Sequence, residues 1–279
     1  MQKRALAIHD ISCVGRCSLT VALPILSAAG VNTSVIPTAL LSTHTGEFTG
    51  YTHLDLSDQL LPIAKHLSTL GLHFDAFYSG YLASAGQVNI ILEIVDMLCD
   101  DHTRIFVDPA FADHGKLYTN MDTSMPSQMR RLCTRAHTII PNFTEASFLL
   151  GKPYLAGGYD DAYVQSLAAE LALLGPQSVV ITDVRVRDGQ TGVAVYQKET
   201  RAFKLFYGQK FDGIFYGTGD AFASFLIACM LGGLPLEKAA RTALDCTHEA
   251  IRLTLEGGEP LRYGVQFERV LPQLIDALK

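Results

Sequence analysis

A glycine-rich turn followed by an acidic residue is the segment of the sequence best suited to chemistry. Gly217-Thr218-Gly219-Asp220 runs directly into an apolar, helix-forming stretch that extends to about residue 231. Glycines allow the backbone to take positive φ and to approach a ligand closely, and the free N–H groups at a helix N-terminus favour anions. A carboxylate in the first turn, beside a bound phosphoryl group, could accept a proton from an alcohol. We therefore predict phosphoryl transfer to a hydroxyl group, with Asp220 as the catalytic base.

One other interpretation of this turn stays open on its sequence alone. It is not a Walker A loop, because no Gly-Lys-Ser/Thr is present, and no Gly-x-Gly-x-x-Gly follows a predicted strand. An ordinary glycine-rich turn, with Asp220 interacting favourably with the helix dipole, would give the same pattern. A carboxylate is nevertheless a sufficient base, because the transition state of phosphoryl transfer is loose and the alcohol loses its proton late.

The elements that must position this turn are short apolar runs alternating with helical patterns, which is typical of βα units around a mostly parallel sheet. The predicted strands are residues 4–8, 31–37, 39–41, 76–78, 104–107, 138–140 and 178–181, with an antiparallel edge hairpin at 191–197 and 202–209. The predicted helices are residues 18–29, 57–70, 87–99, 127–135, 144–150, 160–174, 219–231, 235–255 and 267–278. No linker divides the chain, so we predict a single domain over residues 1–279.

Polar clusters follow most of the predicted strands. They lie at residues 10–12, 42–46, 79–81, 108–109, 141–145 and 182–183. Ligands in open α/β sheets bind at the carboxyl ends of the strands. These clusters are therefore expected to converge on one edge of the sheet, although turns are commonly polar for purely structural reasons.

Composition excludes several classes of function. The 279 residues include 22 basic and 28 acidic side chains, with no basic run that predicts nucleic-acid binding. No apolar stretch approaches the length of a membrane span, and the apolar run at residues 5–8 is too short for the hydrophobic region of a signal peptide. The six cysteines form no Cys-x-x-Cys pair, which argues against a zinc site. We therefore expect free cysteines in a reducing cytoplasm. A charged fraction of only 18% is compatible with an apolar oligomer interface.

The motifs together resemble the ribokinase-like superfamily and, within it, the pyridoxal/pyridoxamine (vitamin B6) kinases, over nearly the whole chain. The 217–222 segment is similar to the superfamily's anion hole and catalytic base. The resemblance implies an α/β fold, a ribokinase-like three-layer α/β/α sandwich with a central mostly parallel sheet. It also implies ATP-dependent phosphorylation of the 5'-hydroxymethyl group of pyridoxal, pyridoxamine or pyridoxine, with Mg²⁺ as cofactor and a homodimer as the assembly. Whether a monovalent cation assists stays undecided.

The resemblance assigns the acceptor pocket to the first third of the chain. Leu41-Ser42-Thr43-His44-Thr45-Gly46 is similar to the Phe-Ser-Asn-His-Thr segment of vitamin B6 kinases, and Ser79-Gly80-Tyr81 to their Ser/Thr-Gly-Tyr segment. Thr45 and Tyr81 are thus implied to line the pyridine pocket, with His44 orienting Thr45. Physically, a tyrosine ring can pack on a heteroaromatic ring. The segment containing Asp10 and Ser12 is also implied to bind the acceptor.

The nucleotide and metal sites are assigned in the same way, from segments similar to the family's Asp-Pro, Pro-Asn-x-x-Glu and Val-Ile-Thr-Ser segments. Residues implied to lie near the nucleotide are Asp108, Asp113 in a flap, Asn142, Thr182 and Asp183. Glu145 and Asp108 are implied to hold Mg²⁺. Two protein ligands are enough for this ion, because Mg²⁺ keeps several of its waters.

Departures from the family pattern leave alternatives. Asp10 and Asp183 stand where the family often has serine, and we hypothesise that Asp10 favours pyridoxamine. A hydroxymethylpyrimidine (phosphate) kinase of thiamine synthesis is the closest rival, but its usual Gly-Gly-Ala-Gly segment is replaced here by residues 12–18. Sugar or nucleoside kinases, and a non-catalytic vitamin-binding protein, are more distant alternatives.

Overall fold

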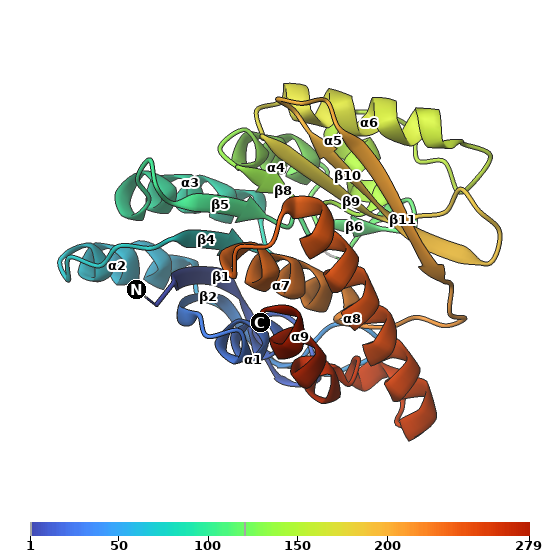
Figure 1. Ribbon diagram of the computed structural model, residues 1–279. Coiled ribbons are helices and arrows are strands. Elements are labelled where there is room, and N and C mark those ends of the chain that lie inside the picture. The colour runs from blue at the N-terminus through green and yellow to red at the C-terminus, as the bar shows by residue number, and fades with distance from the viewer. Residues whose placement is uncertain (1, 120) are drawn as a thin grey trace.

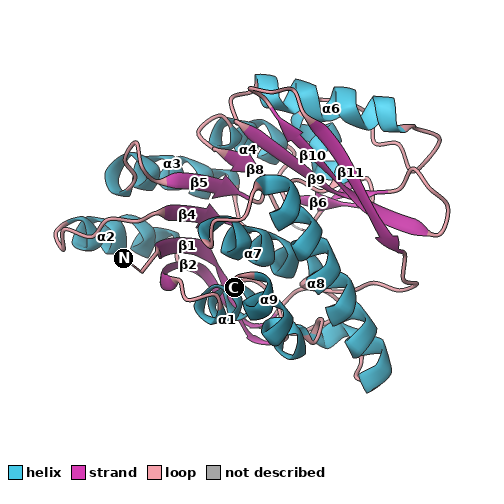
Figure 2. Cartoon of the chain, in the orientation of Figure 1, coloured by secondary structure: helices cyan, strands magenta, loops and turns pink. Residues whose placement is uncertain are grey.

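The computed structural model describes residues 2–119 and 121–279. In this part of the chain, nine strands form one sheet with the order β11-β10-β9-β8-β5-β4-β1-β2-β3 (Figure 2). The strands are β1 (Arg4–Val14), β2 (Asn32–Thr43), β3 (His53–Asp55), β4 (Ala76–Ser79), β5 (Arg104–Val107), β8 (Thr138–Ile139), β9 (Ser178–Val184), β10 (Gln190–Gln197) and β11 (Phe203–Gln209). Neighbours from β2 to β9 pair in parallel, whereas β3, β10 and β11 are antiparallel to their neighbours.

Helices cover both faces of the sheet (Figure 1). One layer comprises α1 (Leu19–Ala28), α7 (Thr218–Leu231), α8 (Leu236–Gly257) and α9 (Leu271–Ala277). The other comprises α2 (Ser57–Ser68), α3 (Ala85–Leu98), α4 (Met125–Cys133), α5 (Phe143–Leu149) and α6 (Asp161–Leu173). The predicted three-layer α/β/α sandwich with an antiparallel edge hairpin is therefore confirmed.

Strand β1 shows why the chain takes this architecture. Successive side chains of a strand point to opposite faces. Ala5 and Ala7 accordingly join the core beneath α1 and α7, while Leu6 and Ile8 join the core beneath α2 and α3. A parallel sheet covered on both faces needs apolar residues at consecutive positions, and this strand supplies them. None of the helices in the described ranges has the length and apolar content to cross a membrane.

Several boundaries differ from the sequence-based prediction. Strand β2 is continuous rather than broken after Pro37, and Pro37 pairs with His9 of β1. On the other side of β2, strand β3 pairs only with Ala39–Leu41. The missing N–H of Pro37 therefore interrupts no ladder with β3. Strand β3 and the small hairpin of β6 (Ala112–Asp113) and β7 (Lys116–Leu117) were not predicted.

The last predicted helix, residues 267–278, is in fact two elements. A 3₁₀ turn, η2 (Phe267–Val270), precedes α9, whose first turn contains Pro272. Proline lacks an N–H group and its ring collides with the carbonyl four residues earlier. A single α-helix through this position is therefore disfavoured.

Candidate active site

A cleft of about 750 Å³ opens at the carboxyl ends of the parallel strands. Most residues that the sequence assigned to a site line this cleft. They are Asp10, His44, Thr45, Tyr81, Asp108, Asp113, Asn142, Glu145, Thr182, Asp183, Gly217, Thr218, Gly219 and Asp220. Ser12 is not among the lining residues: it is fully buried, and its hydroxyl lies 3.5 Å from Asp10 Oδ2. The structure thus gathers segments more than 200 residues apart at one edge of the sheet.

The glycine turn forms the N-terminus of α7. Gly217 is the residue before the first helical position and has a left-handed backbone, with φ of 72°. A Cβ atom there would lie 2.0 Å from the carbonyl oxygen of Arg16. Both the conformation and the space therefore require glycine. The first N–H groups of α7 have no partner within the helix, so this end of α7, which lines the cleft, suits an anion.

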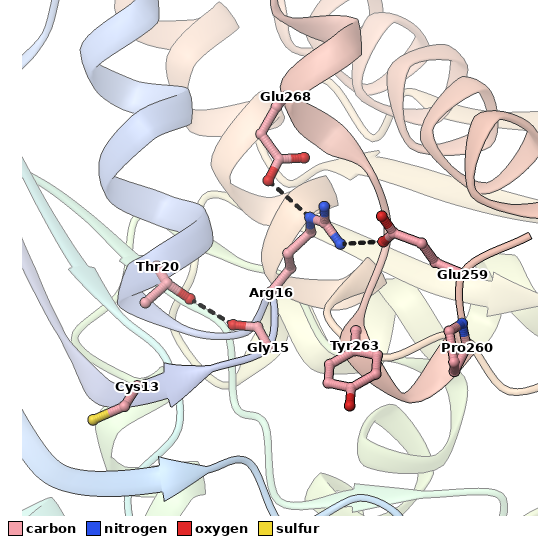
Figure 3. Close-up of a pocket in the computed structure, with 8 residues that line it drawn as sticks. All are labelled: Cys13, Gly15, Arg16, Thr20, Glu259, Pro260, Tyr263 and Glu268. Carbon is pink, nitrogen blue, oxygen red and sulfur yellow. Dashed lines mark hydrogen bonds and ion pairs between the residues drawn. The ribbon is translucent and has the colours of Figure 1, made fainter. Parts of the chain in front are cut away.

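The loop that packs against this turn is itself firmly held. The guanidinium of Arg16 donates to Glu268 through Nε at 2.7 Å and to Glu259 through Nη1 at 3.2 Å, beside a surface hollow of about 550 Å³ (Figure 3). The Arg16 carbonyl would also lie 2.6 Å from a Cβ atom at Gly264. This loop is fixed between the C-terminal segment and the glycine turn, and it leads to Ser18.

Asp220 lies in the first turn of α7 with both carboxylate oxygens engaged. Oδ2 accepts from the backbone N–H of Ser18 at 2.8 Å, and Oδ1 lies 3.0 Å from Nε2 of His9. Burial would raise the pKa of Asp220, but the hydrogen bonds to His9 and Ser18 and the charge of His9 lower it below its usual value. Each oxygen keeps a further lone pair. Asp220 is thus an ionised carboxylate able to accept a proton from a ligand.

His9, next to Asp10 in the sequence, is the buried group whose contacts with the site the sequence did not predict. Its ring is 1% exposed and bridges two carboxylates, with Nδ1 3.0 Å from Asp10 Oδ1 and Nε2 at Asp220. Burial acts to lower its pKa, but the hydrogen bonds to Asp10 and Asp220 and their charges raise it to about 10. Asp10 Oδ1 also accepts from the Ser18 hydroxyl at 2.5 Å. Asp10 is therefore largely occupied within the protein, although it borders the cleft.

The predicted acceptor side of the cleft is formed by the residues after β2 and β4. His44 Nε2 lies 2.6 Å from the Arg262 carbonyl and so must donate to it, while Nδ1 accepts from the N–H of Gly46 at 3.1 Å. Burial lowers the pKa of His44, in agreement with this neutral tautomer. The ring packs 4.9 Å from that of Tyr216. Burial and Asp10 raise the pKa of Tyr81 to about 12, so its ring is a neutral wall.

Asp108 and Glu145 were predicted to hold a metal ion. Burial, and secondarily the charge of Asp220, raises the pKa of Asp108 to about 7. Burial and Asp108 likewise raise the pKa of Glu145 well above normal. Burial thus disfavours the ionised form of both carboxyl groups, and a divalent cation would stabilise their charged forms, although no group of three or more potential ligands is preformed among the described residues.

Glu145 also has a structural role that the sequence did not suggest. Its Oε2 accepts from the Asn142 N–H at 2.9 Å, while the Asn142 side chain accepts from the Glu145 N–H, which forms a capping box at α5. Oε1 accepts from the N–H groups of Phe111 at 2.9 Å and Ala112 at 3.3 Å. Glu145 therefore ties α5 to the loop that follows Asp108.

The predicted nucleotide side contains Thr182 and Asp183 at the end of β9. Asp183 has a left-handed φ of 57° and accepts from Nε of Arg185 at 2.7 Å. Burial raises its pKa, and Arg185 opposes that shift. Arg185 and Lys210 also line the cleft and were not identified from the sequence. Among the described residues that line the cleft, these two are the only lysine or arginine residues. Their positive charge could balance that of negative phosphates.

A mostly parallel sheet with a buried carboxylate at a glycine-rich helix N-terminus is the arrangement expected of a kinase with the ribokinase-like fold. The model of the phosphomethylpyrimidine kinase family matches residues 23–263. The chain therefore belongs to this family.

Individual relatives agree with the predicted resemblance to vitamin B6 kinases. The pyridoxine/pyridoxal/pyridoxamine kinase of Bordetella avium is 30% identical over 260 residues, which cover 85% of this chain and 82% of the relative. A Bacteroides thetaiotaomicron protein, named as a candidate phosphomethylpyrimidine kinase and crystallised with pyridoxal, is 36% identical with a TM-score of 0.93; the match covers 98% of this chain and 96% of that one. Pyridoxal kinase from Lactobacillus plantarum is 29% identical with a TM-score of 0.90, covering 99% and 98%.

Proposed function

We propose that the protein transfers the γ-phosphoryl group of ATP to the 5'-hydroxymethyl group of pyridoxal, pyridoxamine or pyridoxine. The observation that carries this proposal is the position of Asp220. It lies at the anion-binding start of α7, in a cleft that Tyr81 and Thr45 border towards one end and Thr182 and Asp183 towards the other. Relatives named as vitamin B6 kinases, and a relative crystallised with pyridoxal, support the choice of acceptor.

In the proposed reaction, the acceptor hydroxyl oxygen forms a bond to the γ-phosphorus of ATP. The bond from this phosphorus to the β,γ-bridging oxygen breaks, ADP leaves with the electron pair, and the hydroxyl proton passes to Asp220. The N–H groups of Thr218 and Gly219 would stabilise the charge on the transferred group, because both residues line the cleft in the first turn of α7, where N–H groups have no partner within the helix. Arg185 and Lys210 supply positive charge for the nucleotide phosphates.

Magnesium fits this site, with Asp108 and Glu145 as the residues that would hold it. The ion would supply positive charge against the phosphates of ATP and the buried carboxylates. Asn142 would contribute through its position beside Glu145. Its own amide Nδ2 is already engaged, because it donates to the Ala112 carbonyl at 2.7 Å. Asp113, in the β6–β7 hairpin, would close over the nucleotide as a flap.

The assembly and location belong to the same proposal. We propose one catalytic domain over residues 1–279 and a cytoplasmic homodimer. Leu40 on β2 and Leu54 on β3 are direct register partners, and they are 40% and 56% exposed. This apolar edge supports self-association. Light scattering on the purified protein would detect the dimer, and a Leu54→Lys substitution is expected to dissociate it.

A second candidate function is phosphorylation of hydroxymethylpyrimidine or its phosphate, for which the family is named. Turnover of ATP with each of the three B6 vitamers and with hydroxymethylpyrimidine distinguishes the two. The proposal expects a 5'-phosphate from at least one vitamer at higher kcat/KM than from the pyrimidine. A preference for the pyrimidine by tenfold or more would reverse the assignment.

A further inference from the structure

His9 and Asp10 are consecutive residues of one strand, yet their side chains meet. In a regular strand they would point to opposite faces of the sheet. The pairing of β1 with β2 shifts register between His9 and Ile11: Asp10 alone stands opposite two residues of β2, Thr38 and Ala39, so the extra residue of this bulge belongs to β2. The ladder is therefore irregular at Asp10, and there the Asp10 carboxylate lies 3.0 Å from Nδ1 of His9.

The opposite side of the His9 ring is accommodated by Gly80 on the neighbouring segment. A Cβ atom at Gly80 would lie 1.9 Å from Cδ2 and 2.0 Å from Nε2 of His9. The backbone of Gly80 does not have positive φ, so the need for glycine is one of space alone. The glycine between Ser79 and Tyr81 therefore leaves room for the ring that contacts Asp220.

The two carboxylates determine the protonation state of His9. An ionised carboxylate only accepts hydrogen bonds, so both ring nitrogens must carry protons to satisfy Asp10 and Asp220 together. The backbone N–H groups of Asp10 and Tyr81 lie 3.1 and 3.3 Å from Nδ1 and Nε2. A neutral ring could accept from one of them, but it would then turn a lone pair toward a buried carboxylate. The charged ring avoids that repulsion.

We propose that His9 is a positioning residue for the catalytic base: as an imidazolium held by Asp10, it fixes the orientation of Asp220 and keeps it ionised. This inference rests on the proposed kinase function and assigns a role to a buried group that the reaction itself does not consume. Asp220 Oδ1 is held by His9 and Oδ2 by the Ser18 N–H. The carboxylate therefore cannot rotate freely, and it borders the cleft with a side chain that is 16% exposed.

The charge of His9 is needed because the surroundings of Asp220 otherwise favour its protonated form. The charged and titratable groups facing it are His9 and Asp10 from β1, Cys17 before α1, His44 after β2, Tyr78 on β4, Asp108 after β5 and Tyr118 after β7. Of these, His9 is in direct contact and Asp108 is a second buried acid. Without the imidazolium, burial and Asp108 would both raise the pKa of Asp220.

The first test concerns the ligand-free protein and needs no activity. Nitrogen-15 NMR of histidine-labelled protein should show both ring nitrogens of His9 protonated at pH 8, with deprotonation near pH 10. The Asp10→Asn substitution should lower that midpoint by about 1–3 pH units, because it removes one of the two adjacent charges. A neutral His9 at pH 8 in the native protein would overturn the inference, whatever the enzyme phosphorylates.

The second test uses turnover by the full chain with ATP and a B6 vitamer. Gln at position 9 can keep a donor towards Asp220 but not the charge, so His9→Gln should lower kcat at neutral pH about 10- to 100-fold. The KM values should stay within about twofold, and the acidic limb of the kcat profile should move up by about 1–3 pH units. His66→Gln, at an exposed histidine without a side-chain partner among the described residues, is the control and should match the native enzyme.

The outcomes of the two tests are separable. Unchanged kcat and pH profile in His9→Gln, in an enzyme that turns over normally, would overturn the inference. A native protein that is inactive on every vitamer but has a charged His9 would overturn the proposed function. It would still support the inference that a charged His9 holds Asp220. If His9→Gln does not fold, Asp10→Asn takes its place: it should shift the acidic limb in the same direction by a smaller amount, and an unshifted limb would count against the inference.

Discussion

The two glycines on either side of Thr218 differ sharply in what a methyl group would meet, and this difference predicts opposite effects of the same substitution. Gly217 has φ of 72°, and its Cβ atom would lie 2.0 Å from the Arg16 carbonyl oxygen. Gly219 lies inside α7, and nothing lies within 4 Å of the Cβ position. Alanine at 217 should therefore disturb the turn, whereas alanine at 219 should disturb only a ligand that approaches its backbone.

The magnitudes follow from the local structure. A left-handed conformation costs alanine about 1–2 kcal/mol, and overpacking against a backbone atom adds roughly 1–3 kcal/mol. Gly217→Ala should thus lower the free energy of unfolding by about 2–5 kcal/mol. Movement of the turn by ~1 Å should also reduce kcat about 100-fold. Gly219→Ala should instead raise the free energy of unfolding by about 0.5–1 kcal/mol, because alanine is the better helix former.

Urea unfolding and steady-state kinetics on the two variants check these values. Gly219→Ala is expected to lose kcat/KM for ATP while gaining stability, a combination that a purely structural glycine cannot give. If it is stabilised and fully active, no phosphoryl group approaches the backbone at this point. If Gly217→Ala is as stable as the native protein, the close packing of this turn on Arg16 is not the constraint described here.

Two further substitutions test the metal side and the acceptor side of the cleft. Because burial and Asp220 raise the pKa of Asp108 from 3.8 to about 7, the folded state binds its proton more tightly than the unfolded chain, and stability is lost as pH rises between these values. Asp108→Asn should therefore raise the melting temperature at pH 8 but not at pH 4, and it should abolish stabilisation by Mg²⁺. Equal melting temperatures of the variant and the native protein at pH 8 would contradict this. A Cβ atom at Gly46 would lie 2.0 Å from the Tyr216 ring, so Gly46→Ala should raise KM for the acceptor about tenfold. Gly157→Ala is the control and should leave this KM unchanged, because nothing lies within 4 Å of a Cβ atom there. Equal KM values for the two variants would exclude a role for Tyr216 packing in acceptor binding.

The features predicted correctly from sequence are those determined by nearby residues. The turn at Gly217 and the helix beginning at Thr218 follow from local composition, and the location of the cleft follows from the βα order. By contrast, strand β3 is three exposed residues long and has no apolar pattern by which it could be identified. Its pairing depends on β2 rather than on its own sequence.

The contacts within the site could not be predicted because they depend on backbone geometry and on distant residues. The bridge from Asp10 through His9 to Asp220 lies where the pairing of β1 with β2 is irregular, and it needs the space at Gly80, seventy residues later. Likewise, nothing in the sequence shows that the Glu145 carboxylate binds three backbone N–H groups. Sequence patterns place such residues near the cleft, but only the structure shows which partner each one contacts.

The central claim is that Asp220 is the base in phosphorylation of a vitamin B6 hydroxymethyl group. Its most direct test is turnover of ATP and Mg²⁺ with pyridoxal, pyridoxamine, pyridoxine and hydroxymethylpyrimidine, by the native protein and by Asp220→Asn. We expect a vitamer 5'-phosphate from the native protein and a kcat lower by about 10²–10⁴-fold in the variant, with similar KM values. Full kcat in Asp220→Asn, or native turnover of the pyrimidine and of none of the vitamers, would contradict the claim.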